Sequence, residues 1–349
     1  MKHHFGDLLD RTGDYWTIVP NRERHAYSAD DEIKDKKAVK ILQSVNTTKI
    51  GKKVFDCPNI EEVTLHDPAK EQVQAIQKLT QLKRLRVTFF RAREIEFISS
   101  LDNAEELILE YVSGFSDLSP LQKLTKLKSL HFENLRGVAN FDGLKGLNSL
   151  RYLHIGGTLD WNQPIEDFTF LEGVPNLEVF SLGFIINKTE FPAFLPVLHL
   201  KHLKKIKIGR ATFKTKEYAF LETALPDVEG CSWGLCWDYS DNFEFLGKRA
   251  GFIKKNSPLV KERCDAFIKL YDQMKKESRT IIESYGQFHL KYKEKVIALT
   301  FEHTRQILNN QISVAFYDIT TLYFEASEED DLRKLGFSKD GKAQTHKYF

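Results

Sequence analysis

Residues Phe115–Leu127 read Phe-Ser-Asp-Leu-Ser-Pro-Leu-Gln-Lys-Leu-Thr-Lys-Leu, and a short apolar pattern begins at Leu127 and continues through Leu130 and Phe132. Leu130 and Phe132 stand two residues apart, so in a β-strand both face the same side. The residue between them faces the other side. This pattern predicts a short strand with one buried face.

The same pattern, apolar-x-x-apolar-x-apolar, recurs along the middle of the chain. Its eight occurrences are Ile60/Val63/Leu65, Leu82/Leu85/Val87, Ala104/Leu107/Leu109, Leu127/Leu130/Phe132, Leu150/Leu153/Ile155, Leu177/Phe180/Leu182, Leu203/Ile206/Ile208 and Val228/Cys231/Trp233. Their first residues are 22, 22, 23, 23, 27, 26 and 25 positions apart. No such unit buries its apolar face alone, so neighbouring units must stack. Val39 and Leu42 fit a degenerate first unit.

The phrase Asp-Leu-x-Pro-Leu-x-x-Leu-x-x-Leu at Asp117–Leu127 resembles the leucine-rich repeat, in the short class found in bacterial internalins. The resemblance implies an α/β fold, a leucine-rich repeat solenoid over 39–237 with a parallel concave sheet of eight or nine strands. Residues 1–38 are then an N-terminal cap region. The Asn that the family places after each strand is missing here, so we expect uneven curvature.

Alternation predicts which side chains point outward from the concave sheet. Strands about 4.8 Å apart make a face roughly 35 Å long over eight units, which suits a protein or peptide ligand. Aromatic side chains among charged neighbours are typical of such interfaces. The candidate binding residues are Arg84, Arg86, Glu106, Glu110, His131, Glu133, Tyr152, His154, Phe184, Lys205 and Lys207.

The composition of the chain indicates which partners, which compartment and which metal sites to expect. Lys+Arg is 51 against Asp+Glu 49, a balance that gives no global reason to expect nucleic acid as a partner. The N-terminus builds no signal peptide and no stretch is apolar enough to span a membrane, so we expect a cytoplasmic protein without a membrane partner. The four cysteines do not form a disulfide framework or a zinc pattern. We expect His66, His131 and His154 on strands that are not neighbours, and therefore no metal and no cofactor.

The repeat pattern stops after Trp237. Asn256-Ser257-Pro258 is typical of a helix start. Apolar residues follow at helical spacing, which predicts a helix of about 25 residues. Residues 238–285 are therefore expected to form a helical cap on the last repeat.

The last sixty or so residues carry a second resemblance. The runs 316–325 and 328–342 resemble the stretch around the first catalytic Asp of DDE-type insertion-sequence transposases, with similarity from about 289 to 344. The resemblance implies an incomplete ribonuclease-H-like fragment in a tail spanning 286–349, joined to the repeats by gene fusion. Asp318 matches the family's first metal-binding carboxylate, near the middle of a strand predicted at about 312–325. The family's second Asp and its Glu have no match here, so we expect Asp318 to be vestigial.

Two classes of function remain open. The leading one is a non-enzymatic protein–protein interaction module. The alternative is DNA transposition, and nucleic acid is not expected as a partner unless the tail is functional. A hydrolase within the repeats finds no support, since Gly-x-Ser-x-Gly, a phosphate loop and His-Glu-x-x-His are all missing from the sequence.

Overall fold

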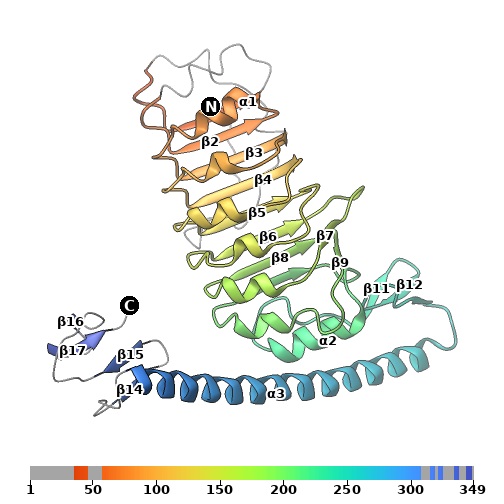
Figure 1. Cartoon of the computed structure of the whole chain (residues 1–349). Helices are drawn as coiled ribbons and strands as arrows, with labels where there is room; N and C mark the ends of the chain where they lie inside the picture. The colour runs from red at the N-terminus through yellow and green to blue at the C-terminus, as the bar shows by residue number, and fades with distance from the viewer. Residues whose placement is uncertain are drawn as a thin grey trace. The chain divides into compact units, whose positions relative to one another are not determined.

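The computed structural model describes residues 35–45, 57–307, 315–318, 321–324, 334–337 and 343–347 (Figure 1). The chain divides into two compact units, Met1–Thr280 and Ile281–Phe349. The boundary predicted between 285 and 286 falls inside one helix that runs through both units.

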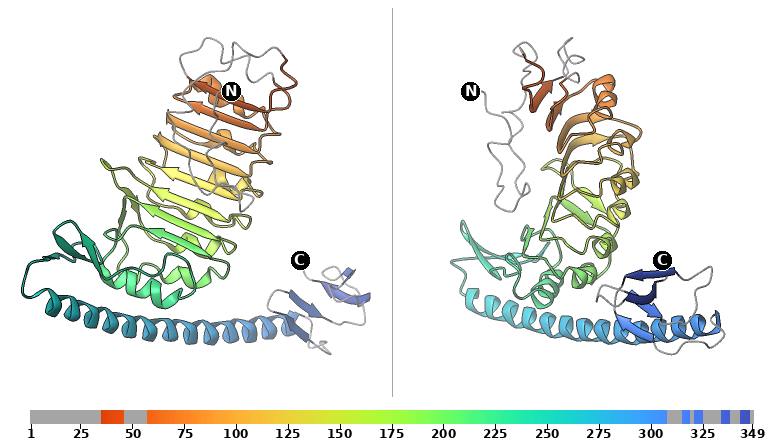
Figure 2. Two further views of the ribbon diagram at one scale, coloured as in Figure 1. Left: turned by 180° about the vertical axis from the view of Figure 1, so that it is seen from behind. Right: turned by 90° about the vertical axis from the view of Figure 1, so that its left-hand side faces the viewer.

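One parallel sheet of eight strands dominates the first unit, and its strands follow one another in chain order (Figure 1 and Figure 2). The predicted parallel sheet is thereby confirmed. Its strands are β1 (Ile41–Val45), β2 (Glu62–His66), β3 (Arg84–Arg91), β4 (Glu106–Ser113), β5 (Ser129–Glu133), β6 (Tyr152–Gly156), β8 (Val179–Gly183) and β10 (Lys205–Ile208). A second, two-stranded parallel sheet pairs β7 (Gln163–Ile165) with β9 (Ile185–Asn187).

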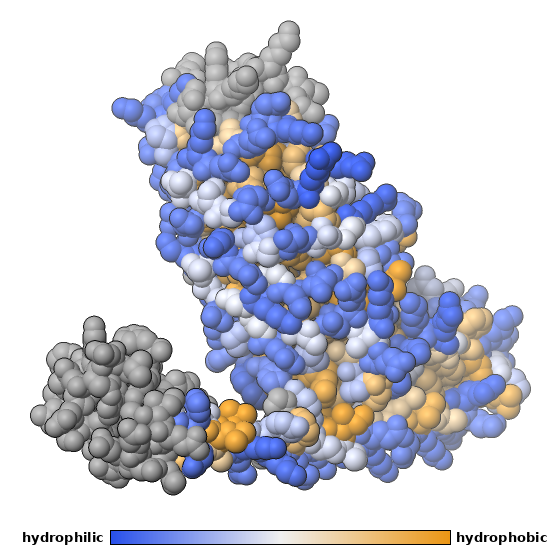
Figure 3. All heavy atoms as spheres, viewed as in Figure 1, coloured by the Kyte–Doolittle hydropathy of each residue, from blue (hydrophilic) through white to orange (hydrophobic). Residues whose placement is uncertain are grey.

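The apolar positions of the repeats form the core. Leu107, Leu130 and Leu153 lie in register across β4, β5 and β6, and all three are buried. Behind the sheet, phenylalanines from successive returns pack together, as Phe168 and Phe194 do with ring centroids 4.7 Å apart. On the face seen in Figure 3, hydrophilic residues cover most of the repeats and hydrophobic residues show between them.

Short helices carry the chain from one strand to the next. They are α1 (Lys70–Ile76), α2 (Thr215–Ala224) and the 3₁₀ helices η5 (Glu96–Ile98), η6 (Ser119–Lys123), η7 (Asp142–Leu144), η8 (Thr169–Gly173) and η9 (Leu195–His199). A side-chain oxygen opens several of these returns. Asp117 and Asp167 each accept the backbone N–H two residues ahead at 2.8 Å, which favours a turn.

The two ends of the sheet differ from the prediction. The degenerate first unit does form a strand, β1, whose Leu42 pairs in register with Val63. The eighth unit forms none, and only an isolated bridge joins Lys205 to Glu229. Gly230 explains the difference, because its φ of +89° breaks the extended backbone. A Cβ at this position would lie 2.1 Å from the carbonyl oxygen of Ile206.

The prediction that the region after Trp237 is helical is wrong for the first part of that region. Three antiparallel strands come first: β11 (Cys236–Tyr239), β12 (Asn242–Phe245) and β13 (Phe252–Lys254). The helix α3 then runs over Val260–Ile307, which is 48 residues rather than about 25. Its only glycine, Gly286, costs about 1 kcal/mol in a helix interior, too little to end it.

Early residues of α3 pack on the end of the repeats. Tyr271 is buried and donates a hydrogen bond of 2.7 Å to Glu222 of α2, and Lys275 forms an ion pair with the same carboxylate. Phe267 stacks on Phe245 of β12. This part of α3 therefore packs against α2 and β12, which both follow the last strand of the repeat sheet.

The second unit contains a small antiparallel sheet. Its strands are β14 (Ala315–Asp318), β15 (Thr321–Phe324), β16 (Lys334–Phe337) and β17 (Ala343–Lys347), in the order β14-β15-β17-β16. The single strand predicted at about 312–325 is wrong, since β14 and β15 pair with each other and Asp318 lies opposite Thr321. Pairing satisfies backbone groups that one lone strand would leave open. Asp318 therefore ends a strand rather than standing at the middle of one.

Candidate binding site

The register of the sheet arranges its outward residues in three rows. The middle row contains Thr64, Arg86, Ile108, His131, His154, Ser181 and Lys207, one residue from each of β2, β3, β4, β5, β6, β8 and β10. The flanking rows run from Glu62 to Lys205 and from His66 to Gly183 in the same way. The alternation predicted from sequence thus corresponds to real rows of neighbours.

Most of the predicted binding residues are less accessible than the prediction assumed. The buried ones are Arg86, Glu106, Glu110, His131 and Tyr152; the half-buried ones are Arg84, Glu133, His154 and Lys205; the exposed ones are Phe184 and Lys207. Long side chains that stand one strand spacing apart contribute to this burial because they cover one another. Arg86 has no exposed surface at all.

Charges alternate between neighbouring strands at the start of the sheet. Arg86 donates to one carboxylate oxygen of Glu110 through Nε at 2.7 Å and through a terminal nitrogen at 2.5 Å. Arg84 donates to Glu62 at 2.6 Å. Basic β3 therefore lies between acidic positions of β2 and β4, and the charges of Arg84 and Arg86 are neutralised within the sheet.

Two histidines meet in the middle row. His131 and His154 stack with ring centroids 4.1 Å apart, and His154 Nδ1 lies 2.8 Å from Ser181 Oγ. The expectation that these histidines are on strands that are not neighbours is wrong, because β5 and β6 are adjacent. Burial, followed by the charge of Lys207, lowers the pKa of His154 to about 4. Burial also lowers the pKa of His131 well below its usual value, with smaller effects from His154 and Arg86.

A cluster of metal-ligand type was missed from sequence. Glu110, His131 and Glu133 have ligand atoms that all lie within 4.8 Å of one another. Glu110 and Glu133 are cross-strand partners, and His131 shares a face with Glu133 on β5. The sequence signal is an acidic residue at the same repeat position in consecutive units, with a His two residues before the second.

In five strands of the sheet, the residue that follows the last outward position has an unusual backbone. Asp67, Phe89, Tyr111, Asn134 and Phe184 all have φ between 47° and 57°. Residues other than Gly adopt this left-handed conformation at a cost, and bulky ones rarely do. Of these five, sequence reasoning selected Phe184 alone. The recurrence of an aromatic residue 22 positions apart, at Phe89 and Tyr111, is the signal that could have found the others.

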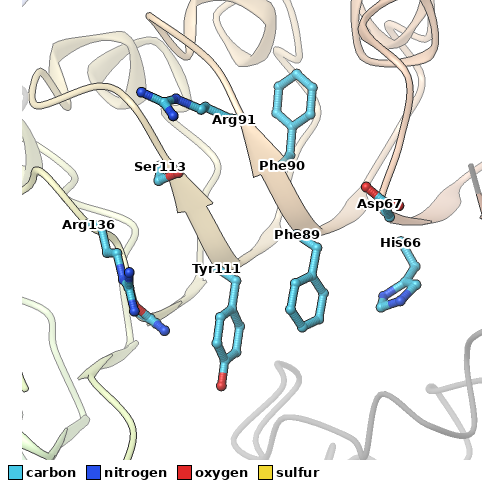
Figure 4. A pocket seen from close by; sticks show the side chains of 9 residues that line it. His66, Asp67, Phe89, Phe90, Arg91, Tyr111, Ser113 and Arg136 are labelled. Carbon is cyan, nitrogen blue, oxygen red and sulfur yellow. The ribbon is translucent and has the colours of Figure 1, made fainter. Parts of the chain in front are cut away.

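Four of these residues, Asp67, Phe89, Tyr111 and Asn134, line a groove of about 550 Å³ along the edge of the sheet (Figure 4). Phe89 and Tyr111 stack with centroids 4.7 Å apart, and His66 meets Phe89 edge-on at 5.2 Å. We call this groove the aromatic edge groove; its lining is His66, Asp67, Phe89, Phe90, Arg91, Tyr111, Ser113, Asn134 and Arg136. Figure 4 shows the His66, Phe89 and Tyr111 rings side by side, with Arg136 beyond Tyr111.

A second groove, of about 600 Å³, is lined mainly by residues that precede the strands and is polar. Its charges pair with each other: Lys128 with Glu105 at 3.1 Å, and Arg151 with Glu178 at 2.7 Å. Burial would raise the pKa of Glu178, but hydrogen bonds from Arg151 and Lys204 outweigh it and lower that pKa to about 2. These contacts connect one repeat to the next, so this groove is better explained by stability than by a ligand.

Comparisons with solved structures return leucine-rich repeat proteins. An internalin (inlF) from Listeria monocytogenes is 18% identical over 58% of this chain and 61% of its own, with a TM-score of 0.41. The internalin C2 of the same organism is 20% identical over 50% of this chain and 72% of its own, with a TM-score of 0.36. A leucine-rich repeat protein of Leptospira interrogans is 14% identical over 52% of this chain and 58% of its own, with a TM-score of 0.31. The chain thus spans less than two thirds of the first of these proteins.

No protein-family model matches the chain, and no curated protein matches it either. The transposase resemblance of the tail gains no support from these comparisons. Within the described part of the chain, no helix combines the length and the apolar character needed to cross a bilayer.

Proposed function

We propose that the repeat unit is a non-enzymatic binding module for a protein or peptide, and that the aromatic edge groove anchors the ligand. The observation that carries the proposal is the stack of Phe89 on Tyr111, held in an unfavourable backbone conformation at the rim of a groove. Strain of this kind persists where the surroundings impose it and is concentrated at functional sites.

The chemistry of the groove indicates the kind of ligand. Phe89 is 41% exposed, so its ring offers apolar area that a bound side chain can cover. Arg91 and Arg136 provide positive charge on the same rim. A volume of about 550 Å³ holds a few side chains rather than a whole domain. The ligand that fits is a peptide segment with an apolar or aromatic anchor next to a carboxylate.

Some of the candidate binding residues predicted from sequence extend the surface around the aromatic edge groove. Phe184 occupies the same repeat position as Phe89 and Tyr111, directly after the last outward residue of the sheet, and it is 48% exposed. Lys207 is also exposed in the middle row. We propose that the buried members of the set, such as Arg86 and Tyr152, support the surface and do not contact the ligand.

A hydrolytic role for the Ser181–His154 pair is not favoured. The same arrangement recurs in the same sheet, where His66 Nδ1 lies 2.7 Å from Thr88 Oγ1. In both pairs, the histidine meets a hydroxyl of the next strand through Nδ1, which orients the ring. A repeated contact of this kind is explained by the repeat geometry, without any reaction.

The binding proposal is tested by selecting peptides from a displayed library on the full-length chain. The affinity of the selected peptides is then measured for the wild type and for Phe89→Gly/Tyr111→Gly. Removal of both anchor rings is expected to weaken binding about tenfold or more. The control is Leu159→Ala, which truncates an exposed apolar residue outside the groove. Equal affinity for the wild type and the double variant would overturn the proposal.

We further propose that the transposase-like tail has no catalytic role. Asp318 is the last residue of β14, whereas the resemblance required it near the middle of a strand. The test is nicking of supercoiled DNA in Mg²⁺ or Mn²⁺ by the wild type and by Asp318→Ala. We expect no nicking from either chain. Nicking by the wild type that is lost in Asp318→Ala would establish the alternative, DNA transposition chemistry.

A further inference from the structure

We propose that Glu110, His131 and Glu133 form a binding site for a divalent first-row transition metal, with Zn²⁺ as its representative. The site lies on the outward face of β4 and β5, and the peptide proposal above does not use it. One ligand atom from each of the three residues lies within 4.8 Å of the other two. Since metal–ligand bonds to N and O are about 2.0–2.2 Å long, two ligands of one ion stand up to about 4.4 Å apart. Small side-chain rotations therefore suffice to close the cluster around an ion.

His131 is the residue that points to a ligand. It is 6% exposed, and among the described residues neither ring nitrogen has a hydrogen-bond partner. Buried polar atoms nearly always have a partner, and an exception calls for an explanation such as a bound ion. A ring nitrogen without a hydrogen-bond partner offers the lone pair that a metal needs.

The charges around His131 favour a cation. Glu110 and Glu133 bring two carboxylates to directly opposite positions on neighbouring strands, an arrangement that is unfavourable without a positive charge between them. Arg86 supplies one positive charge, and two of its hydrogen bonds go to the same oxygen of Glu110. A carboxylate has a second oxygen with lone pairs of its own, so the ion pair and metal binding are compatible.

The surroundings hold the imidazole in place. His154 stacks on His131 at 4.1 Å and is itself held by Ser181, so the His131 ring has little freedom to turn. Gly156 lies opposite Glu133 on the next strand and has no side chain to fill this part of the face. A Cβ at Gly156 would come within 2.6 Å of His154 Nε2, so glycine is needed there for the ring pair to form.

The donor set selects the class of metal. An imidazole nitrogen with carboxylate oxygens suits Zn²⁺, Mn²⁺, Fe²⁺ or Co²⁺, whereas Ca²⁺ and Mg²⁺ prefer oxygen ligands throughout. Three protein ligands leave at least one coordination position for water or for a group from a bound partner.

The experiment uses the full-length chain carrying His3→Ala and His4→Ala, because two adjacent histidines bind transition metals on their own. After treatment with a chelator, the protein is titrated with Zn²⁺ by calorimetry and with Co²⁺ by visible absorption. We expect one ion per chain, a ligand-field spectrum with Co²⁺, and a higher unfolding midpoint with Zn²⁺.

The deciding variant is Glu133→Gln, which keeps the shape of a half-buried side chain and removes its charge. It should weaken binding about tenfold or more and abolish the Zn²⁺-dependent rise in the unfolding midpoint. His131→Gln should do the same if circular dichroism shows that it folds. Glu166→Gln, at an exposed carboxylate away from the cluster, should change nothing. Wild-type affinity in Glu133→Gln, or no binding at all by the chain that lacks His3 and His4, would overturn the proposal.

Discussion

The rings of Phe89 and Tyr111 stack nearly parallel, with centroids 4.7 Å apart and an interplanar angle of 14°, although both residues have φ above 50°. Each residue comes directly after the last outward position of its strand, β3 on one side and β4 on the other, so the repeat period brings the rings together. A ladder of bulky residues in the left-handed conformation is costly, and the costs recur at Asp67, Asn134 and Phe184. The backbone conformation at the end of the strand is therefore a property of the repeat, while the side chains that it displays differ from unit to unit.

This backbone leads to an unusual prediction for glycine. Phe89→Gly should be about 1 kcal/mol more stable than Phe89→Ala, since both lose the ring but only glycine adopts φ near +54° without strain. Elsewhere in a strand the usual order holds, so Phe252→Ala should be more stable than Phe252→Gly. Urea unfolding of the four variants measures both differences. The same order at the two positions would contradict a strained Phe89.

The buried ion pair between Arg86 and Glu110 predicts strong coupling. Replacing either partner alone, as in Arg86→Met or Glu110→Gln, should cost about 3 kcal/mol because it leaves the other charge buried. The double variant should be less destabilised than the sum of the two single variants. A double-mutant cycle from urea unfolding measures the coupling, and additivity within about 0.5 kcal/mol would show that the two charges do not depend on each other.

The repeat sheet and its core could be predicted because both depend on a period that the sequence displays directly. Leu130 and Phe132 follow from alternation, and stacking follows from the constant step. The lack of a strand in the eighth unit could not be predicted, since Val228, Cys231 and Trp233 fit the apolar pattern and the positive φ of Gly230 interrupts the extended backbone. Local conformation overrode the pattern at that point.

The candidate site was harder to predict for two physical reasons. Alternation tells which side of a strand a residue occupies, but the accessibility of Arg86 or His131 depends on how far neighbouring side chains cover it. The aromatic edge groove depends on positive φ at Phe89 and Tyr111, which residue type alone argues against. The domain boundaries also stay predictions. The one predicted between 285 and 286 falls within α3, which continues through that position.

Glu217 of α2 makes the stability of the repeat unit depend on pH. Burial raises its pKa to about 7, although the backbone N–H of Ala193, 3.1 Å away, opposes the shift. A carboxyl group whose pKa is raised on folding stabilises the protein fully below its unfolded pKa near 4.5, and this contribution is lost as the pH rises to 7. The loss amounts to at most about 3 kcal/mol.

Glu217→Gln keeps an oxygen for Ala193 and cannot ionise, so it should remove this dependence. The difference in unfolding free energy between variant and wild type should move in favour of the variant from pH 5 to pH 8. Comparing the two proteins at each pH cancels the contributions of other groups, such as His154. A difference that stays constant with pH would mean that Glu217 titrates normally.

Truncations of α3 should separate the part that stabilises the repeats from the part that does not. Contacts that join α3 to the repeat unit include those of Phe267, Tyr271 and Lys275, which lie before Gly286. A chain that ends after Gly286 should therefore unfold within a few degrees of the full-length protein. A chain that ends after Ser257 exposes the surface that buried Tyr271 covers and should lose about 3 kcal/mol, which lowers the unfolding midpoint by several degrees.

Tyr271→Phe in the full-length chain should have a midpoint between those of the two truncated chains, since it removes one hydrogen bond to Glu222, worth about 1 kcal/mol, and keeps the packing of the ring. Differential scanning calorimetry of the four proteins gives the midpoints directly. If the chain ending after Gly286 were as unstable as the one ending after Ser257, the later part of α3 would have to stabilise the repeats as well.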